Sequence, residues 1–178
     1  MQVISLNSLM KASDEEGVIA YLSSFCCHKN DDVESFLREK AMENEKRSLS
    51  RTSLVVDEDN SSEIIGYFTL TIRHFKLQYE ISKSTRQKLA GSRDADIFST
   101  MLIAQLGRSD LYKGKVPGKE ILDLALQNCK MIHDLAGLRV VCVEYENIPY
   151  LNDFYMVNEF VYLGKNPDND LNISYIRL

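Results

Sequence analysis

The segment YKGKVPGK at residues 112–119 stands directly before a predicted helix and combines flexible with positively charged residues. A helix N-terminus exposes backbone amides that lack partners within the helix, and its dipole favours negative charge. Glycine lets the backbone approach a ligand closely, and lysine neutralises phosphate groups. The residues of these two kinds are Lys113, Gly114, Lys115, Gly118 and Lys119. The segment therefore indicates a phosphate-binding loop.

The spacing of the two loop glycines excludes two common phosphate sites. It matches neither G-x-G-x-x-G nor G-x-x-x-x-G-K-[ST], so neither a Rossmann dinucleotide site nor a P-loop is predicted. The local alternative is a solvated loop whose glycines serve only to cap the helix. The loop alone leaves both interpretations open.

The cysteines and histidines predict no metal site. The cysteines form one adjacent pair and two single residues in apolar surroundings, with neither C-x-x-C spacing nor a nearby pair of histidines. We expect Cys129 and Cys142 in the core, and Cys26 and Cys27 as free thiols. A capping role at the end of a helix suffices for His133.

The second half of the chain predicts the elements that position the loop. Residues 101–107 and 138–144 have the composition of strands, and a helix is predicted at 117–135 between them. Gly137 supplies a left-handed stop, and a right-handed crossover makes the two strands parallel neighbours. A helix at 150–157 and strands near 161 and at 171–176 follow. The expected buried face of the long helix comprises Ile121, Leu122, Ala125, Cys129, Ile132 and Leu135.

The first half predicts a strand at 2–6, a helix from an N-cap at Ser13 to about residue 25, and a second helix from Asp31 or Asp32. The second helix has an apolar face of Val33, Phe36, Leu37 and Ala41. Strands at 52–57 and 63–77, joined by a polar turn at 58–62, predict a hairpin. Residues 78–100 predict an irregular crossover with one helix near 82–90.

Length and composition favour one globular domain spanning residues 1–178. The chain has 178 residues, of which 44% are hydrophobic and 26% charged. Its net charge of −5 argues against a broad nucleic-acid-binding surface. It has no apolar run of the roughly 18 residues that a membrane helix needs, and its N-terminus lacks the cationic segment of a signal peptide. We expect a cytoplasmic protein.

Segment 102–122, LIAQLGRSDLYKGKVPGKEIL, resembles the acetyl-CoA motif of the GNAT superfamily, in which a strand leads into a Q/R-x-x-G-x-G/A loop that opens a helix. In the ungapped register, Lys113 takes the first position of the motif and Gly118 the last. Val116 replaces the middle glycine, whose amide normally lies against the pyrophosphate. The departure implies weaker or rearranged cofactor binding.

The resemblance extends over nearly the whole chain. The pieces FCCH at 25–28, VESFLREKA at 33–41, IGYFTL at 65–70 and FY at 154–155 are similar to landmarks of GNAT toxins of toxin–antitoxin pairs. The implied fold is α/β, a central mixed sheet of about six to seven strands flanked by helices. A splay between the strands at 101–107 and 138–144 is also implied.

The same resemblance implies roles for individual residues. Leu106, Gly107 and Arg108 would lie along the pantetheine of acetyl-CoA, where a backbone amide can polarise the thioester carbonyl. Tyr155 would be the acid that protonates the departing thiolate. The alternative is that its ring only packs. Asn147 resembles an asparagine that hydrogen-bonds the cofactor arm. Glu144 and Glu146 end a strand and are expected in solvent, so no general base is assigned.

The function implied is an acetyl-CoA-dependent N-acetyltransferase that uses acetyl-CoA as co-substrate and acts on a primary amine. The acceptor can be a small molecule, a protein or an aminoacyl-tRNA, which is the acceptor of the toxin relatives. A tRNA would need a basic patch, for which the candidates are Arg38, Lys40, Arg86, Lys88 and Arg93. Val116 keeps open a non-catalytic acyl-CoA-binding or interaction module. An antitoxin partner and a homodimer also stay open.

Overall fold

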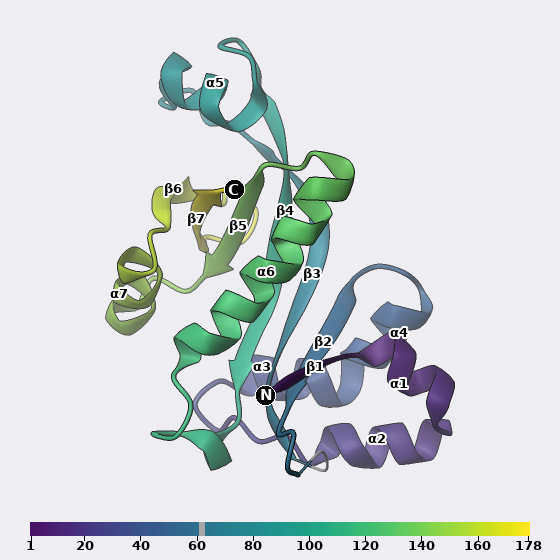
Figure 1. The fold of residues 1–178 in the computed structure, drawn as a ribbon. Helices are drawn as coiled ribbons and strands as arrows, with labels where there is room; N and C mark the ends of the chain where they lie inside the picture. Colours follow the sequence, from purple (N-terminus) through teal and green to yellow (C-terminus); the bar gives the residue numbers. More distant parts are fainter. Residues whose placement is uncertain (61–62) are drawn as a thin grey trace. The chain divides into compact units, whose positions relative to one another are not determined.

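The computed structural model describes residues 1–60 and 63–178. Its described part contains seven strands in the hydrogen-bonded order β1-β2-β3-β4-β5-β7-β6 (Figure 1). Ser61 and Ser62 of the predicted turn lie outside the described residues.

The elements follow one another along the chain with these bounds: β1 Gln2–Ser5, α1 Leu6–Ala12, α2 Glu15–Ser23, α3 Asp31–Ser35, a π-helical turn Phe36–Lys40, α4 Ala41–Lys46, β2 Arg51–Val56, β3 Ile64–Lys76, α5 Lys83–Ala90, β4 Ile97–Arg108, a 3-10 turn Asp110–Tyr112, α6 Gly118–Ala136, β5 Val140–Tyr145, α7 Pro149–Val157, β6 Val161–Lys165 and β7 Asn172–Arg177.

The chain divides into two compact units, each with its own apolar core. The first unit comprises Met1–Thr71 and Ala104–Ala125, and the second comprises Ile72–Ile103 and Leu126–Leu178. The long elements β3, β4 and α6 supply residues to both. The single domain expected over residues 1–178 stays a prediction.

In the first unit, β2 pairs antiparallel with both β1 and the start of β3. The pairing of β2 with β3 runs from Arg51 opposite Leu70 to Val55 opposite Gly66, and the register shifts between Val55 and Val56. The hairpin predicted from the β-branched and aromatic residues is thereby confirmed.

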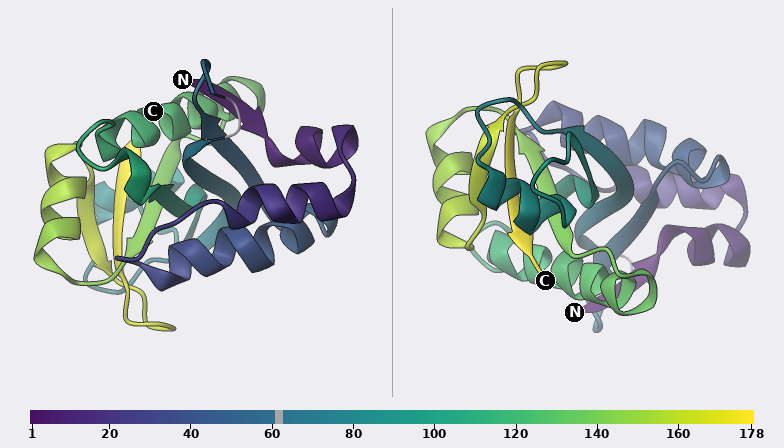
Figure 2. Two further views of the ribbon diagram at one scale, coloured as in Figure 1. Left: turned by 90° about the horizontal axis from the view of Figure 1, so that it is seen from below. Right: turned by 90° about the horizontal axis from the view of Figure 1, so that it is seen from above.

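The helices α1 to α4 pack beside one another in the first unit (Figures 1 and 2). Their inward side chains share one cluster with residues of the hairpin, because each helix carries an apolar stripe. The buried members are Leu6, Val18, Leu22, Phe25, Val33, Leu37, Ala41, Met42, Leu54, Val56, Ile64 and Tyr67.

The prediction for residues 2–25 was wrong in its middle part. The first strand ends at Ser5, and the short helix α1 follows where the prediction had none. Leu6 is fully buried and Leu9 packs against the same cluster, a three-residue step that suits a helix. The next helix starts one residue later than expected, because Asp14, and not Ser13, caps it by accepting a 2.7 Å hydrogen bond from the Gly17 amide.

The helix predicted from Asp31 begins at that residue, where the Asn30 side chain caps it. The predicted apolar face is confirmed for Val33, Leu37 and Ala41, which are buried. The pattern did not show that the helix is interrupted by the π-helical turn Phe36–Lys40.

In the second unit, β5 lies between β4 and β7. It pairs parallel with β4 and antiparallel with β7, which forms a hairpin with β6. The parallel neighbours predicted from the crossover are confirmed. The pairing of β4 with β5 runs from Met101 opposite Val141 to Ile103 opposite Val143, although β4 continues to Arg108. This short register is what the expected splay requires.

The crossover at residues 78–100 contains the predicted helix. The Ser82 side chain caps α5 by accepting from the Thr85 amide at 3.1 Å, and Gly91 ends it with a φ of +80°. Glycine tolerates this left-handed conformation without a steric cost.

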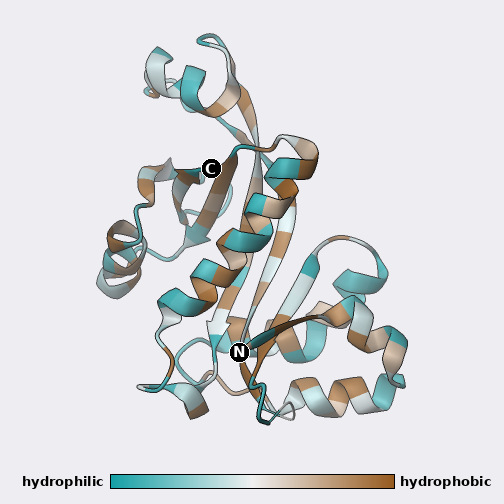
Figure 3. Ribbon diagram, in the orientation of Figure 1, coloured by the Kyte–Doolittle hydropathy of each residue, from teal (hydrophilic) through white to brown (hydrophobic). Residues whose placement is uncertain are grey.

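Helix α6 shows alternating hydrophobic and hydrophilic bands along its length (Figure 3). The predicted buried face is confirmed at Ile121, Leu122, Ala125 and Cys129. The prediction was wrong for Leu135, which is 89% exposed in the last turn of the helix.

The fold class is confirmed as a mixed sheet flanked by helices. Among the described residues, none of the helices combines the length and the apolar character that a bilayer crossing demands.

Candidate functional site

The loop between β4 and α6 is anchored at its start by backbone and side-chain contacts within the first unit. The Ser109 amide donates to the Ile65 carbonyl at 2.8 Å. The buried Tyr112 donates its hydroxyl to Glu63 Oε2 at 2.8 Å. Burial, followed by this bond to Glu63, raises the pKa of Tyr112, so its phenol stays protonated. The first residues of the loop are therefore held in place by these hydrogen bonds.

The backbone amides of the loop fall into two groups. Those of Lys115 and Val116 both donate to the Tyr112 carbonyl at 3.0 Å. Those of Gly114, Gly118 and Lys119 donate to no acceptor in the part of the chain that the structure describes. The free amides lie on the loop and in the first turn of α6, where an anion is favoured.

At the middle position of the predicted motif, the expectation that Val116 weakens or rearranges cofactor binding stays a prediction. Because the Val116 amide is already bonded to Tyr112, it is not a free donor for a phosphate. Gly114 has a φ of +79°, and a Cβ there would meet nothing within 4 Å. The free amide within the loop itself is therefore at Gly114.

The three loop lysines differ in how their charge is used. Lys119 Nζ is bonded to Asp123 at 2.5 and 2.7 Å, one turn along α6. Lys115 Nζ lies 5.6 Å from the centre of the Tyr112 ring, a cation–π contact. Lys113 forms no ion pair with a described residue. Its charge is the most available of the three.

Arg108 ties the end of β4 to the loop. Its Nη1 donates to the Val116 carbonyl at 2.8 Å. Its Nε is buried and has no hydrogen-bond partner among the described residues. A buried donor without an acceptor is costly, and an anion or a water can satisfy it. The donors present fit a phosphate-bearing cofactor.

Gly107 serves packing in this structure. A Cβ built on it would lie 2.5 Å from Val33 Cγ1 and 3.0 Å from Tyr67 Cε1. Its carbonyl oxygen would be 2.5 Å from a Cβ on Gly66, so the backbones of β3 and β4 approach closely here. The preceding residue, Leu106, is half-buried.

Tyr155 lies in the second unit, on α7, within a group of aromatic rings. Its ring centre is 4.6 Å from that of Tyr145, 5.2 Å from Phe154 and 5.4 Å from Phe160. Tyr155 is 7% exposed, and burial, with a smaller effect of Tyr145, raises its pKa. Its hydroxyl makes no hydrogen bond to a described residue. The phenol is therefore held protonated, as an acid must be.

Asn147 belongs to a cluster of three asparagines in the second unit. Its Oδ1 accepts from Asn152 Nδ2 at 3.0 Å and from Asn172 Nδ2 at 3.2 Å. Asn172 Nδ2 also lies 3.0 Å from Asn152 Oδ1. The cluster borders a pocket of about 360 Å³ lined by Tyr145, Asn147, Asn152, Met156, Phe160, Tyr162, Asn172 and Ser174. Sequence reasoning missed Asn152 and Asn172, because Asn147 precedes α7 and the other two asparagines reach it only through the fold.

Glu144 is not the solvated strand-end carboxylate that we expected. Its Oε1 accepts from Asn166 at 2.5 Å and from Asn169 at 3.3 Å, and its Oε2 lies 3.7 Å from Arg73. The side chain is 9% exposed. These hydrogen bonds give Glu144 a structural role, because they connect β5 with the turn between β6 and β7.

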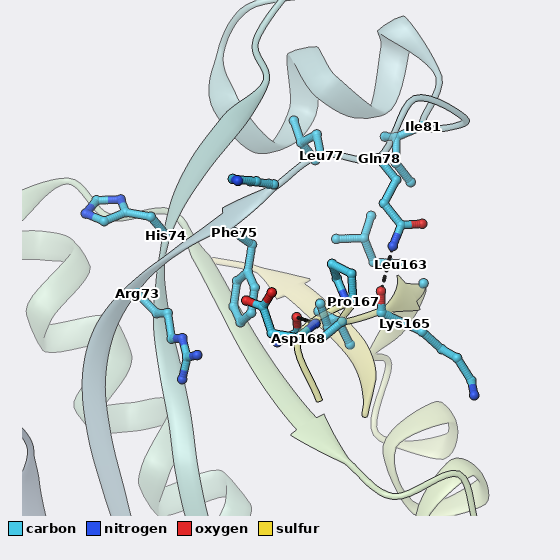
Figure 4. Close-up of a pocket in the computed structure, with 14 residues that line it drawn as sticks. Arg73, His74, Phe75, Leu77, Gln78, Ile81, Leu163, Lys165, Pro167 and Asp168 are labelled. Carbon is cyan, nitrogen blue, oxygen red and sulfur yellow. Dashed lines mark hydrogen bonds between the residues drawn. The ribbon is translucent and has the colours of Figure 1, made fainter. Parts of the chain in front are cut away.

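A second pocket of about 190 Å³, which sequence reasoning missed, lies in the second unit beside this hairpin. Figure 4 shows Arg73, His74 and Phe75 of β3 on one side and Leu163, Lys165 and Asp168 on the other. Gln78 closes part of it by donating to the Lys165 carbonyl at 2.7 Å. Its lining combines cationic and apolar side chains from segments far apart in the sequence, so no local sequence motif predicts this pocket.

The structure brings the predicted cofactor-binding residues of β4, the loop and α6 together in the first unit, and it places Tyr155 and Asn147 in the second.

No protein-family model and no curated protein matches the chain. Solved structures do match it. A bacterial toxin has a TM-score of 0.73 at 18% identity, covering 99% of this chain and 90% of the toxin. AtaTR bound with AcCoA has 0.73 at 17%, covering 99% and 92%. AtaT complexed with acetyl-methionyl-tRNAfMet has 0.71 at 17%, covering 88% and 86%. The chain has the GNAT fold. Within this GNAT fold, the loop before α6 is the segment on which the acetyl-CoA motif was expected.

Proposed function

We propose that the protein is an acetyl-CoA-dependent N-acetyltransferase. The observation that carries the proposal is the set of unsatisfied donors around the loop: the free amides of Gly118 and Lys119 and the buried Nε of Arg108. Phosphate groups are suited to such donors at a helix N-terminus. The shared fold with AtaTR, which was solved with AcCoA, supports acetyl-CoA as the ligand.

Acetyl-CoA supplies an acetyl group activated as a thioester, and a primary amine attacks its carbonyl directly. The loop amides and Lys113 hold the phosphates, and Arg108 keeps the loop in position through Val116. Tyr155 supplies the proton to the departing thiolate, since a phenol with a pKa at or above 10.0 is protonated at neutral pH. The attacking nitrogen loses its proton to water, and the Tyr155 phenolate takes a proton back from water, so the protons balance. Asn147 serves the cofactor arm only if the amides of Asn152 and Asn172 release its oxygen.

The binding half of the proposal is tested by thermal unfolding with and without acetyl-CoA. A ligand that binds only the folded state raises the melting temperature. Gly118→Val should remove this rise, because its side chain would fill the place of the phosphates. Ala136→Val adds volume at the other end of the same helix and should keep the rise. An unchanged rise in Gly118→Val would refute the loop assignment.

The catalytic half is tested with Tyr155→Phe, which removes only the hydroxyl. If Tyr155 is the acid, turnover should fall by about 10²–10⁴-fold while acetyl-CoA affinity stays nearly constant. Tyr150→Phe is the matched control, since Tyr150 lies on the same helix and is 59% exposed. Full turnover in Tyr155→Phe, with chemistry rate-limiting, would leave the tyrosine a packing role only.

The acceptor that we propose to test first is the amino group of an aminoacyl-tRNA, because AtaT was solved with acetyl-methionyl-tRNAfMet. Two of the five cations of the expected basic patch already have partners within the protein. Arg86 is buried and donates to the carbonyls of Ile81, Ala95 and Gln78. Arg38 is bonded to Glu34 and the Phe25 carbonyl. Contacts to tRNA would therefore have to come from the remaining candidates, Lys40, Lys88 and Arg93, which are exposed, or from cations outside the expected patch.

Release of CoA in the presence of aminoacyl-tRNA, peptides and small amines separates these acceptors. A chain that binds acetyl-CoA but releases CoA with none of them would be a non-catalytic acyl-CoA-binding module.

A further inference from the structure

A cluster of three different metal-ligand types lies in the first unit, where the segment after α2 meets the start of the loop. The thiol of Cys26, the imidazole of His28 and the carboxylate of Asp110 have ligand atoms within 4.8 Å of one another. The sequence spacing did not show the cluster, because Asp110 stands 82 positions after His28. None of the three was among the residues predicted for the acetyl-CoA site.

One backbone hydrogen bond and the side chain of Asp110 hold the two segments together. The Asp110 amide donates to the Cys26 carbonyl at 2.9 Å. The His28 amide donates to Asp110 Oδ2 at 2.8 Å, and His28 Nδ1 lies 2.8 Å from the same oxygen. The ligand atoms are therefore brought close by the fold, and little ordering is needed to use them.

The cluster has an inner and an outer side. Cys26 is half-buried, and its Sγ lies 3.7 Å from the hydroxyl of the fully buried Ser109. The His28 side chain is 80% exposed and that of Asp110 is 30% exposed. An ion can reach the three groups from solvent.

We propose that Cys26, His28 and Asp110 bind a Zn²⁺ ion. Sulfur, imidazole nitrogen and carboxylate oxygen together suit this borderline-soft cation better than Ca²⁺ or Mg²⁺, which prefer oxygen alone. Three protein ligands leave one tetrahedral position for water. On binding, the Cys26 thiol and the His28 ring nitrogen that ligates the ion give up their protons to the solvent, and the carboxylate of Asp110 ligates in its ionised form. It joins the segment after α2 to the turn from which the phosphate loop starts.

The test uses the full chain, freed of metal with a chelator and titrated with Zn²⁺ against a chromophoric competitor. We expect one ion per chain. Cys26→Ser, His28→Ala and Asp110→Asn should each weaken binding by at least about tenfold, since even second-shell changes cost 10–100-fold. Cys27→Ser is the matched control, because the adjacent thiol is outside the cluster. It should bind Zn²⁺ as the unchanged chain does.

Substitution with Co²⁺ reports the ligand set directly. A thiolate-to-cobalt charge-transfer band should appear in the near ultraviolet, persist in Cys27→Ser and vanish in Cys26→Ser. His28→Ala separates loss of metal binding from loss of folding, because its exposed imidazole does not belong to the core. Its melting temperature without metal should match that of the unchanged chain. No saturable binding at one ion per chain, or equal loss in Cys27→Ser and Cys26→Ser, would overturn the proposal.

Discussion

The guanidinium of Arg108 and the carbonyl of Val116 are joined by a 2.8 Å hydrogen bond that spans the base of the loop between β4 and α6. The same side chain keeps a buried Nε without a partner among the described residues. Arg108 thus holds the loop through Nη1, and its Nε remains a buried donor that a ligand or a water can use.

Arg108→Ala should weaken acetyl-CoA binding by about tenfold or more, because a hydrogen bond from a charged group contributes about 1.5–3 kcal/mol. Isothermal titration measures the affinity. Arg47→Ala removes an exposed arginine of the same unit and should leave the affinity unchanged. Equal affinity in the two variants would show that Arg108 does not hold the loop for the ligand.

Gly107→Ala should destabilise the protein by about 1–3 kcal/mol, since its Cβ would lie 2.5 Å from Val33 Cγ1. Gly114→Ala meets no neighbour within 4 Å and should cost only about 1 kcal/mol, for a left-handed alanine. Denaturant unfolding compares the two free energies. The reverse order of cost would mean that the first unit relaxes readily around Gly107.

Tyr155 should titrate at a higher pH than the ordinary tyrosine pKa of 10.0, because burial disfavours the phenolate. The folded state then holds this proton more tightly than the unfolded state. The resulting stability is present below pH 10.0 and is lost as the pH rises through the pKa of the folded protein. An ultraviolet titration of Tyr155→Phe should lack one phenol in the late part of the curve. A missing phenol in the early part would contradict the buried environment.

Glu45→Ala should destabilise the first unit by about 1–3 kcal/mol, because a buried donor would lose its acceptor. The Glu45 carboxylate accepts from the Thr52 amide and from Arg51 Nη1, each at 2.7 Å, and so connects α4 with β2. Glu43→Ala is the control, an exposed residue of the same helix. Denaturant unfolding of both variants measures the difference, and equal stabilities would count against this connection.

Local signals in the sequence predicted the elements well where one residue decides a boundary. Gly91 and Gly137 have positive φ at the ends of α5 and α6, and Ser82 caps α5, because these effects act within a few residues. Helix α1 was missed because its seven residues are too few to establish a period, and burial of Leu6 decides it. Leu135 was wrongly predicted to be buried, because the hydrophobic periodicity of a helix does not show which of its turns extend beyond the elements that it packs against.

The sequence points to a candidate site where that site is continuous, as in the loop from Lys113 to Lys119, and the role of this loop stays a prediction. The site was not predictable where tertiary structure brings distant residues together. Asn172 contacts Asn147 only because β7 pairs with β5. Asp110 contacts His28 although 82 positions separate them in the chain, so their contact depends on the tertiary fold. The use of the Val116 amide depends on a turn that single-residue patterns do not encode.

That turn bears on the type of residue that position 116 accepts. The Val116 amide donates to the Tyr112 carbonyl within the chain, so this turn closes with a residue other than glycine at position 116. A β-branched residue then limits the conformations of the unfolded segment and lowers the entropy lost when the loop forms. A pattern search that demands glycine there would pass over chains whose loop is closed in this way.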